Sequence, residues 1–343
     1  MIDEILLNAG KTISILNNIT PCNADEEKIS FLKGNNPNFQ YSDLNYEPIS
    51  IATKLSNLRF PNNIIGWVYE NIRKEIFLEN LIVTHRGTEL AKDASIKLYN
   101  KPSTILVQQA EKILSTTSRK KAPKIIPQDQ IKEALEQEFT AQGLDWKVIY
   151  HKRKTTTAKP EHKEIAVCED RNFTNIDLKR IPVHEFWVHT VRAVNGYEQP
   201  YPILAKCTAG YLPTEEGLTT YFEEITGTML PETMISYAAR LIAVDSMCRD
   251  FTFKETFDRL KSHNLNDSDS WELTLRAHRG GGYAKDQVYL QGYYLIKTFA
   301  KQDGDFKSLY VGKVGIQDLV WVRGMLRKGE LNKPKLLPPF IPS

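Results

Sequence analysis

One short run constrains this chain more than any other part of its sequence: residues 183–190 are Val-His-Glu-Phe-Trp-Val-His-Thr. Two histidines with a glutamate directly after the first offer a divalent metal ion two neutral nitrogens and a carboxylate beside them. In the familiar zinc-binding helix the histidines are four residues apart, which places both on one face. His184 and His189 are five apart, and on an ideal α-helix that spacing separates the side chains by roughly 140°. If both bind one ion, the helix must contain a π-type turn or end near His189, and such bulges occur at functional sites.

The composition excludes several classes of protein. The chain has 343 residues, 41% of them hydrophobic and 25% charged, which is typical of a globular protein with a large core. Its 45 basic and 42 acidic residues nearly balance, so we expect neither nucleic acid nor a membrane surface as a partner. No apolar run approaches the roughly 18 residues that span a bilayer, and the acidic start, Met1–Glu4, is unlike a secretory signal. The four cysteines form no CxxC pair, which indicates reduced thiols in a cytoplasmic protein.

Helical patterns dominate, and one linker-like segment divides them. The sequence pattern of residues 1–115 predicts helices, and no side chain among these residues suggests a catalytic role. The segment Ser115–Pro127 has the composition of a linker, so we expect a helical N-terminal region, 1–115, and a second region, 116–343, that holds the histidine run. The second region ends in Pro334–Ser343, whose four prolines favour an extended strap.

Two strands are expected before the histidine run, at Trp146–Tyr150 and Glu164–Cys168. The basic, threonine-rich stretch between them, Lys152–Lys163, favours a long hairpin with one strand at a sheet edge. Together these patterns predict a fold class that is mainly α with a small antiparallel β element, an α+β arrangement.

The third ligand of a metal ion is expected on a second helix. A catalytic zinc ion has three protein ligands and leaves a fourth position for water. The next helix along the chain is predicted to begin with Thr214 as its N-cap. In its first turn Glu216 is the favoured ligand and Glu215 the runner-up, while Glu223 lies two turns further along the same face. Without the histidines, these glutamates would indicate only an ordinary acidic first turn.

Glu185 follows the first histidine, and its side chain points about 100° away around the helix, beside a metal ion but not on it. A carboxylate in that position can act as general base towards a water molecule whose pKa zinc lowers to about 7. The simpler interpretation is a helix with two surface or core histidines, which the triplet alone does not exclude.

A glycine-rich turn at residues 279–282 has polar flanks of interest. Lys285 and Tyr289 share a helix face at the i, i+4 spacing, and Tyr289 is a candidate hydrogen-bond donor to a tetrahedral oxyanion. Arg276, Arg279 and Lys285 are candidates for binding the terminal carboxylate of a substrate. Taken without the histidine run, this stretch would indicate a turn with salt-bridged flanks.

Together these residues resemble the microtubule-associated tyrosine carboxypeptidases and their bacterial relatives, described as flavohaemoglobin expression-modulating QEGLA-motif proteins. The resemblance rests first on the His-Glu-x-x-x-His spacing, followed 25 residues after its second histidine by Thr214–Leu218. This sequence has Glu215 and Thr219 where the QEGLA form has glutamine and alanine. The similarity extends through nearly the whole chain, in the blocks Thr20–Ala24, Gly87–Tyr99, Lys285–Gly292 and Leu309–Lys313.

The resemblance implies a zincin-like metallopeptidase with one Zn²⁺ per chain. It implies His184, His189 and Glu216 as the metal ligands and Glu185 as the catalytic base. Eukaryotic members of the family remove a C-terminal tyrosine from α-tubulin. The expected partner is therefore the C-terminal tail of a peptide or protein.

We therefore expect a zinc carboxypeptidase that cleaves by attack of water, without a covalent intermediate. The strand Glu164–Cys168 is the candidate edge for pairing with the substrate backbone, and the basic Lys152–Lys154 would favour an acidic tail. Two alternatives remain open: a non-catalytic regulatory protein with the same metal ligands, and a zinc endopeptidase.

Overall fold

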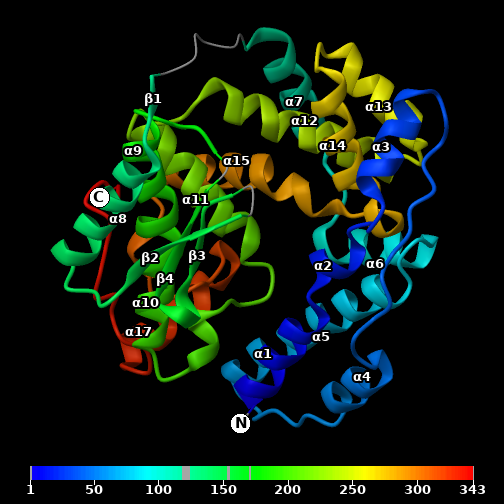
Figure 1. Cartoon of the computed structure of the whole chain (residues 1–343). Helices are drawn as coiled ribbons and strands as arrows, with labels where there is room; N and C mark the ends of the chain where they lie inside the picture. Colours follow the sequence, from blue (N-terminus) through cyan, green and yellow to red (C-terminus); the bar gives the residue numbers. More distant parts are fainter. Residues whose placement is uncertain (1, 118–123, 153–154, 170, 343) are drawn as a thin grey trace. The chain divides into compact units, whose positions relative to one another are not determined.

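Helices form most of the regular structure (Figure 1), and strands are few and short, which confirms the predicted fold class. The computed structural model describes residues 2–117, 124–152, 155–169 and 171–342. No helix within that part of the chain is long and apolar enough to cross a membrane.

The chain forms two compact units. The first combines Met1–Ser118 with Thr233–Leu290, and the second combines Arg119–Glu232 with Gln291–Ser343. The division into an N-terminal region, 1–115, and a second region, 116–343, stays a prediction. Residues 118–123 of the predicted linker, with its Arg119-Lys120-Lys121 run, lie outside the described part of the chain.

The first unit is built from helices and short 3₁₀ turns. Its elements are α1 (Ile2–Ile13), α2 (Ile15–Ile19), α3 (Ala24–Leu32), α4 (Pro48–Ser56), α5 (Ile64–Thr84), α6 (Glu89–Tyr99), α7 (Thr104–Thr116), α13 (Phe253–Ser262), α14 (Asp267–His278), η4 (Arg279–Gly281), η5 (Ala284–Gln287) and most of α12 (Pro231–Cys248). The helical start of the chain is interrupted at Ser14, whose φ of 39° lies in the left-handed region. It therefore forms α1 and α2 instead of one helix.

Helix α5 is the central element of the first unit. Its N-cap is Asn63, whose side-chain oxygen accepts a hydrogen bond from the backbone N–H of Gly66 at 2.9 Å. Val68, Ile72 and Ile76 recur at helical spacing and are buried. The helices α1, α2, α4 and α6 all pack against α5, so its apolar stripe organises this unit.

The second unit contains both small sheets and the histidine run. Its elements are β1 (Ile125–Ile126), α8 (Gln128–Ala141), β2 (Lys147–His151), β3 (Thr157–Lys159), η1 (Pro160–His162), β4 (Glu164–Cys168), β5 (Phe173–Thr174), α9 (Asp177–Ile181), η2 (Pro182–Thr190), α10 (Val191–Tyr197), η3 (Pro202–Ala205), α11 (Leu212–Ile225), most of α15 (Val288–Lys301), α16 (Phe306–Leu309), η6 (Ile316–Asp318) and α17 (Leu319–Lys328).

The three-stranded sheet differs from the predicted hairpin. Both predicted strands exist, as β2 and β4, but they pair in parallel, Lys147 opposite Glu164. A third strand, β3, lies in the stretch predicted to be a loop and pairs antiparallel with β4. The predicted hairpin is wrong. After β2 the chain first forms β3, which runs antiparallel to β4, and only then forms β4 parallel to β2. The three residues of β3, Thr-Ala-Lys, are too few to show the hydrophobic alternation that predicts a strand.

The strand order β2-β4-β3 also corrects the predicted edge strand. Glu164–Cys168 is the central strand, so its backbone groups pair on both sides and cannot take up a further chain. Among the described strands of this sheet, β2 and β3 are the edges. A separate pair, β1 and β5, is antiparallel, with Ile125 opposite Thr174.

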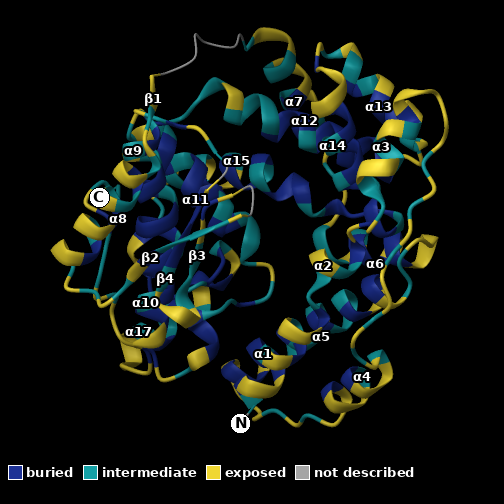
Figure 2. Cartoon of the chain, in the orientation of Figure 1, coloured by how far each residue is buried: buried dark blue, intermediate teal, exposed yellow. Residues whose placement is uncertain are grey.

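The core of the second unit lies between β4, α8 and the helix that carries the histidines. Ile165, Ala166 and Val167 of β4 are fully buried (Figure 2). Phe186 of η2 packs against Phe139 of α8 with ring centroids 5.7 Å apart. Helix α11 packs along η2, so two elements distant in sequence meet beside the histidine run.

Helices α11 and α15 approach each other closely at two glycines. A Cβ on Gly217 would lie 2.2 Å from the carbonyl oxygen of Gly292. A Cβ on Gly292 would lie 2.1 Å from the carbonyl oxygen of Pro213. Both distances are shorter than any side chain tolerates, and the obstructing atoms are backbone. The crossing therefore requires glycine at both positions and fixes the place of α11.

Substituting Gly217→Ala should lower the free energy of unfolding by about 1–3 kcal/mol, because one backbone must move to accept the methyl group. Urea denaturation measures this change. Gly324→Ala on α17 is the control, since a Cβ there meets nothing within 4 Å and should stabilise the helix by about 0.5–1 kcal/mol. Equal stability of Gly217→Ala and the wild type would contradict the close crossing.

Candidate metal centre

The histidine run forms a π-helix. Segment η2 follows α9 directly and continues into α10. The backbone N–H of Val191 donates to the carbonyl of Phe186, five residues earlier. Since this i→i+5 pattern places residues five apart on successive turns, His184 and His189 lie on one face, with ring centroids 5.1 Å apart. The distortion predicted from the spacing is confirmed.

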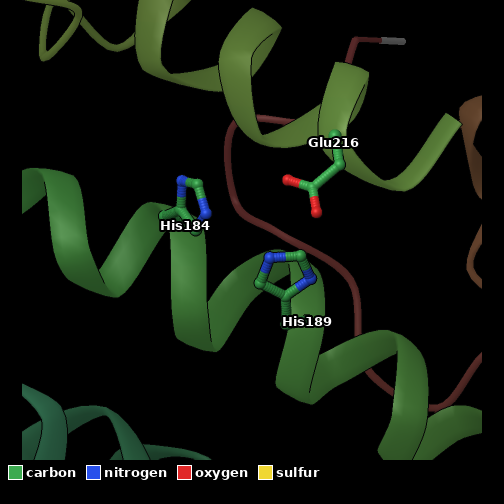
Figure 3. A group of neighbouring side chains, drawn as sticks. All are labelled: His184, His189 and Glu216. Atoms are coloured by element: carbon green, nitrogen blue, oxygen red, sulfur yellow. The ribbon is translucent and has the colours of Figure 1, made fainter. Parts of the chain in front are cut away.

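Helix α11 brings the carboxylate of Glu216 towards both imidazoles (Figure 3). One ligand atom from each of His184, His189 and Glu216 lies within 4.8 Å of the other two. Two nitrogens and one carboxylate oxygen, without a thiolate, are typical of a catalytic zinc site. All three side chains are partly exposed, so solvent reaches them. These residues fit one zinc ion.

The start of α11 differs from the prediction. The helix begins at Leu212, with Pro213 in its first turn, so Thr214 is not the N-cap. The buried hydroxyl of Thr214 instead accepts a hydrogen bond from the backbone N–H of Ile316 at 3.0 Å. Glu216 still lies near the N-terminal end of the helix, where the helix dipole favours a carboxylate.

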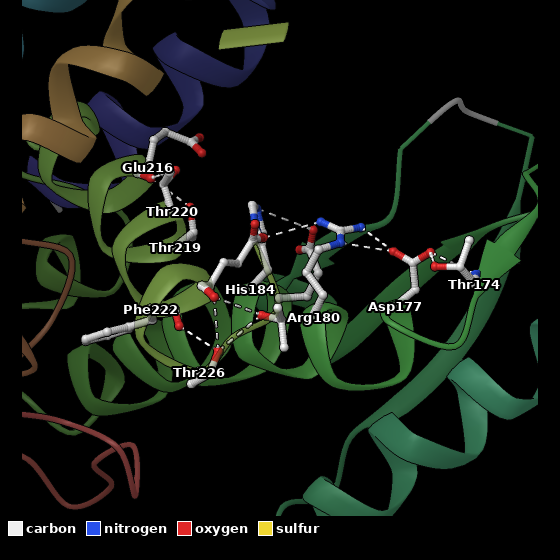
Figure 4. Close-up of polar contacts among 12 residues, drawn as sticks. Thr174, Asp177, Arg180, His184, Glu216, Thr219, Thr220, Phe222 and Thr226 are labelled. Carbon is white, nitrogen blue, oxygen red and sulfur yellow. Dashed lines mark hydrogen bonds and ion pairs between the residues drawn. The ribbon is translucent and has the colours of Figure 1, made fainter. Parts of the chain in front are cut away.

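Glu223 holds the first histidine. Its Oε1 accepts a hydrogen bond from Nδ1 of His184 at 2.9 Å and another from Arg180 at 3.3 Å. The guanidinium of Arg180 also donates to Asp177 at 2.7 Å (Figure 4). Asp177 and Glu223 are each 1% exposed, so this row of alternating charges lies inside the protein. Because Nδ1 is occupied, Nε2 of His184 is left for a metal ion.

Glu215 holds the second histidine in the same way. Its Oε1 accepts a hydrogen bond from Nδ1 of His189 at 2.7 Å. Arg192 contacts the other carboxylate oxygen, and Nζ of Lys313 lies 2.8 Å from Oε1. Burial alone would raise the pKa of Glu215, but Lys313, Arg192 and His189 together hold that pKa well below its usual range. The runner-up ligand therefore orients His189.

The electrostatics around His184 favour positive charge. Burial would lower the pKa of this imidazole, but the hydrogen bond to Glu223 and the charges of Glu185, Glu223 and Glu216 outweigh burial and raise the pKa. A divalent cation at the same place would be stabilised by the same carboxylates.

Glu185 lies beside the proposed ligands without joining them. Its Oε1 is 4.0 Å from Nε2 of His184, and its side chain is largely buried. Its Oε2 accepts a hydrogen bond from the backbone N–H of Ala158, on the edge strand β3, at 2.9 Å. The strand thus fixes the carboxylate next to the face of His184 that is free to bind a metal.

The other predicted site residues, Tyr289, Arg276, Arg279 and Lys285, belong to the first unit. Tyr289 stacks on Tyr237 with ring centroids 4.9 Å apart. Arg276 forms a two-point contact with Asp286, at 2.5 and 2.8 Å. Arg279 is buried, and its Nε has no hydrogen-bond partner among the described residues.

The remaining predicted carboxylate-binding residue, Lys285, interacts electrostatically with Glu79. Burial raises the pKa of Glu79 to about 7, and Lys285 partly opposes that shift. The roles predicted for the first-unit residues stay predictions. Of the basic Lys152–Lys154 stretch, residues 153 and 154 lie outside the described part of the chain.

Sequence reasoning missed the residues that orient the histidines. Glu215 was considered only as a ligand, and Glu223 was given no role, although the seven-residue step from Glu216 does place Glu223 on the helix face towards η2. Arg192 and Lys313 carry no local signal at all, because their partner Glu215 lies 23 residues from the first and 98 from the second.

Comparison with known proteins links this geometry to a family. Residues 31–343 match the family described as microtubule-associated tyrosine carboxypeptidase. The microtubule-associated tyrosine carboxypeptidase 1 of Mus musculus is 23% identical over 344 residues, covering 92% of this chain and 63% of that protein. The protein of the same name from Rattus norvegicus is 23% identical over 351 residues, covering 95% and 66%. The chain thus spans less than two thirds of the length of each relative.

Replacing Glu223→Gln should weaken zinc binding about 10–100-fold, because the amide removes the charge that holds Nδ1 of His184 and Arg180. Competition with a chromogenic chelator measures the dissociation constant.

Glu224→Gln is the matched control for that measurement. Glu224 is the next residue of α11 but contacts Tyr293 and Lys297 instead of a histidine. Its substitution should leave zinc affinity unchanged. Equal loss in both variants, or in neither, would contradict a specific role for Glu223.

Proposed function

The chain belongs to the family of microtubule-associated tyrosine carboxypeptidases, and from that premise and the geometry of its site we propose that it is a zinc-dependent carboxypeptidase. One observation carries the proposal. The π-turn and α11 bring His184, His189 and Glu216 to one point, with the carboxylate of Glu185 alongside. A non-catalytic metal protein would need the three ligands but not Glu185.

In the proposed mechanism His184 and His189, through the ring nitrogens that do not bond Glu223 and Glu215, and a carboxylate oxygen of Glu216 would hold one Zn²⁺. When bound, zinc acts as a Lewis acid and lowers the pKa of water to about 7. Glu185 takes a proton from the attacking water and passes it to the nitrogen of the leaving amine. The N–H of Ala158 keeps this carboxylate in place.

Strand β3 replaces the central strand as the proposed surface for the substrate backbone. It is an edge strand, and on an antiparallel strand the N–H and C=O of one residue point to the same side. The N–H of Ala158 points to Glu185, so its carbonyl faces the same side of β3, away from β4. We propose that this carbonyl accepts a hydrogen bond from the substrate backbone.

The proposed substrate is the C-terminal tail of a peptide or protein. The relatives are named for a terminal tyrosine, which makes tyrosine the first residue to test. Arg279 and Lys285 are the proposed partners of the terminal carboxylate, with Arg276 less available because Asp286 holds it. Tyr289 is the proposed oxyanion donor.

The four cysteines are free thiols, which supports a cytoplasmic location.

Glu185→Gln should lower the rate of cleavage of a peptide ending in tyrosine about 10²–10⁴-fold, because the amide cannot take the proton from water. Mass spectrometry of the products measures the rate, and the wild type should shorten the peptide by one residue. Zinc content should be unchanged, since Glu185 is outside the group of ligands.

Three outcomes would separate the alternatives. Equal cleavage by both proteins would contradict the role of Glu185. Cuts inside the peptide would favour an endopeptidase. Zinc bound by both proteins, without cleavage by either, would favour a regulatory metal-binding protein.

Removing zinc with a chelator should abolish cleavage by the wild type, and adding back one equivalent of Zn²⁺ should restore it, because the proposed chemistry depends on the metal. The same peptide assay measures both steps. Full activity of a protein shown to contain no metal would contradict zinc dependence.

A further inference from the structure

The π-register of η2 changes the partner of one backbone carbonyl. In an α-helix the carbonyl of residue 187 accepts a hydrogen bond from the N–H of residue 191. Here the N–H of Val191 points to the carbonyls of Phe186 and Val188, on either side of Trp187. The carbonyl of Trp187 therefore loses its α-helical donor. Trp187 is only 6% exposed, so it needs a replacement within the protein.

Tyr310 supplies that replacement. Its hydroxyl donates to the carbonyl oxygen of Trp187 at 2.9 Å. The side chain is completely buried, and burial raises the pKa of Tyr310 well above its usual value, so the hydroxyl remains a donor. A residue 123 positions away thus satisfies the carbonyl that the π-turn frees.

The segment that carries Tyr310 is fixed on several sides. Arg192, at the end of the π-helical region, donates to the carbonyls of Leu309 and Val314. Lys313 pairs with Glu215 through its side chain. Its backbone N–H donates to the carbonyl of Leu204 at 2.7 Å. Tyr310 is therefore held in place independently of its bond to Trp187.

A similar close contact lies next to Lys313. A Cβ on Gly312 would lie 2.5 Å from the carbonyl oxygen of Leu204, so the segment passes this loop without room for a side chain. The segment around Tyr310 is thus held by contacts outside η2, so its hydroxyl has a fixed position to which η2 must fit.

We propose that Tyr310 is a positioning residue that selects the π-register of η2 and so sets the approach of His184 to His189. With tyrosine at 310, the carbonyl of Trp187 has a donor in the π-register as well as in the α-register, so the π-register leaves no unpaired carbonyl. With phenylalanine, the π-register leaves the carbonyl without a partner and the α-register does not. In the α-register, side chains five apart diverge by roughly 140°.

Measured through zinc affinity, this proposal rests on the proposed function. The test therefore includes a second measurement, hydrogen exchange, that does not depend on zinc. Tyr310→Phe removes one hydroxyl and keeps the ring. Competition with a chromogenic chelator measures zinc affinity, which should fall at least tenfold. Hydrogen exchange of the metal-free protein, followed on peptides covering residues 182–197, should become at least tenfold faster, while the melting temperature falls by only a few degrees.

Tyr221→Phe is the matched control. Tyr221 also lies in the second unit, on the helix of Glu216, and its hydroxyl has no hydrogen-bond partner among the residues described. Its ring stacks on that of Phe306 and is retained in the variant. Zinc affinity and hydrogen exchange of this variant should match the wild type.

Each other outcome has a definite meaning. Unchanged zinc affinity together with unchanged exchange in Tyr310→Phe would overturn the proposal, and so would a variant that does not fold, because the hydroxyl would then serve general stability. If the wild type binds no zinc, the proposed function fails. Hydrogen exchange still decides the register claim: faster exchange only in Tyr310→Phe would support it, and equal exchange would overturn it.

Discussion

The π-register of residues 182–190 is the constraint on which the rest of the site depends. On a regular α-helix, two histidines five residues apart point in different directions and cannot bind one metal ion. The i→i+5 hydrogen bond of Val191 changes the helix so that the two imidazoles are neighbours. Such a register is less stable than an α-helix unless other groups satisfy the backbone it disturbs. The hydroxyl of Tyr310 does so, and α11 then has only to place Glu216 opposite the two rings.

The two carboxylates that hydrogen-bond the histidines are buried, and each has a cation beside it. Glu215 contacts Arg192 and Lys313, and Glu223 contacts Arg180, which also binds Asp177. Without these partners, burial would neutralise the glutamates, and the imidazoles would lose the acceptors that fix their orientation. Both glutamates lie on α11, but different cations neutralise them: Arg192 and Lys313 pair with Glu215, and Arg180 of α9 pairs with Glu223.

The local parts of this site could be predicted from the sequence, and the non-local parts could not. The histidine spacing predicted a distorted turn if both side chains bind one ion, and a position expected in the first turn of the next helix favoured Glu216 over Glu215. Strand β3 escaped prediction because its three residues, Thr-Ala-Lys, are too few to show a strand pattern. Without β3, neither the parallel pairing of β2 with β4 nor the edge at Ala158 could be predicted. Tyr310 and Lys313 meet their partners only through the tertiary fold, which no local pattern encodes.

We propose that His184, His189 and Glu216 hold one zinc ion in a π-turn. A crystal structure of the zinc-loaded protein, with anomalous data collected on both sides of the zinc absorption edge, would locate the ion. We expect a single strong peak bonded to Nε2 of both histidines and to the carboxylate of Glu216, with residues 182–190 still π-helical. A peak elsewhere, or a regular α-helix with the two imidazoles pointing apart, would contradict it.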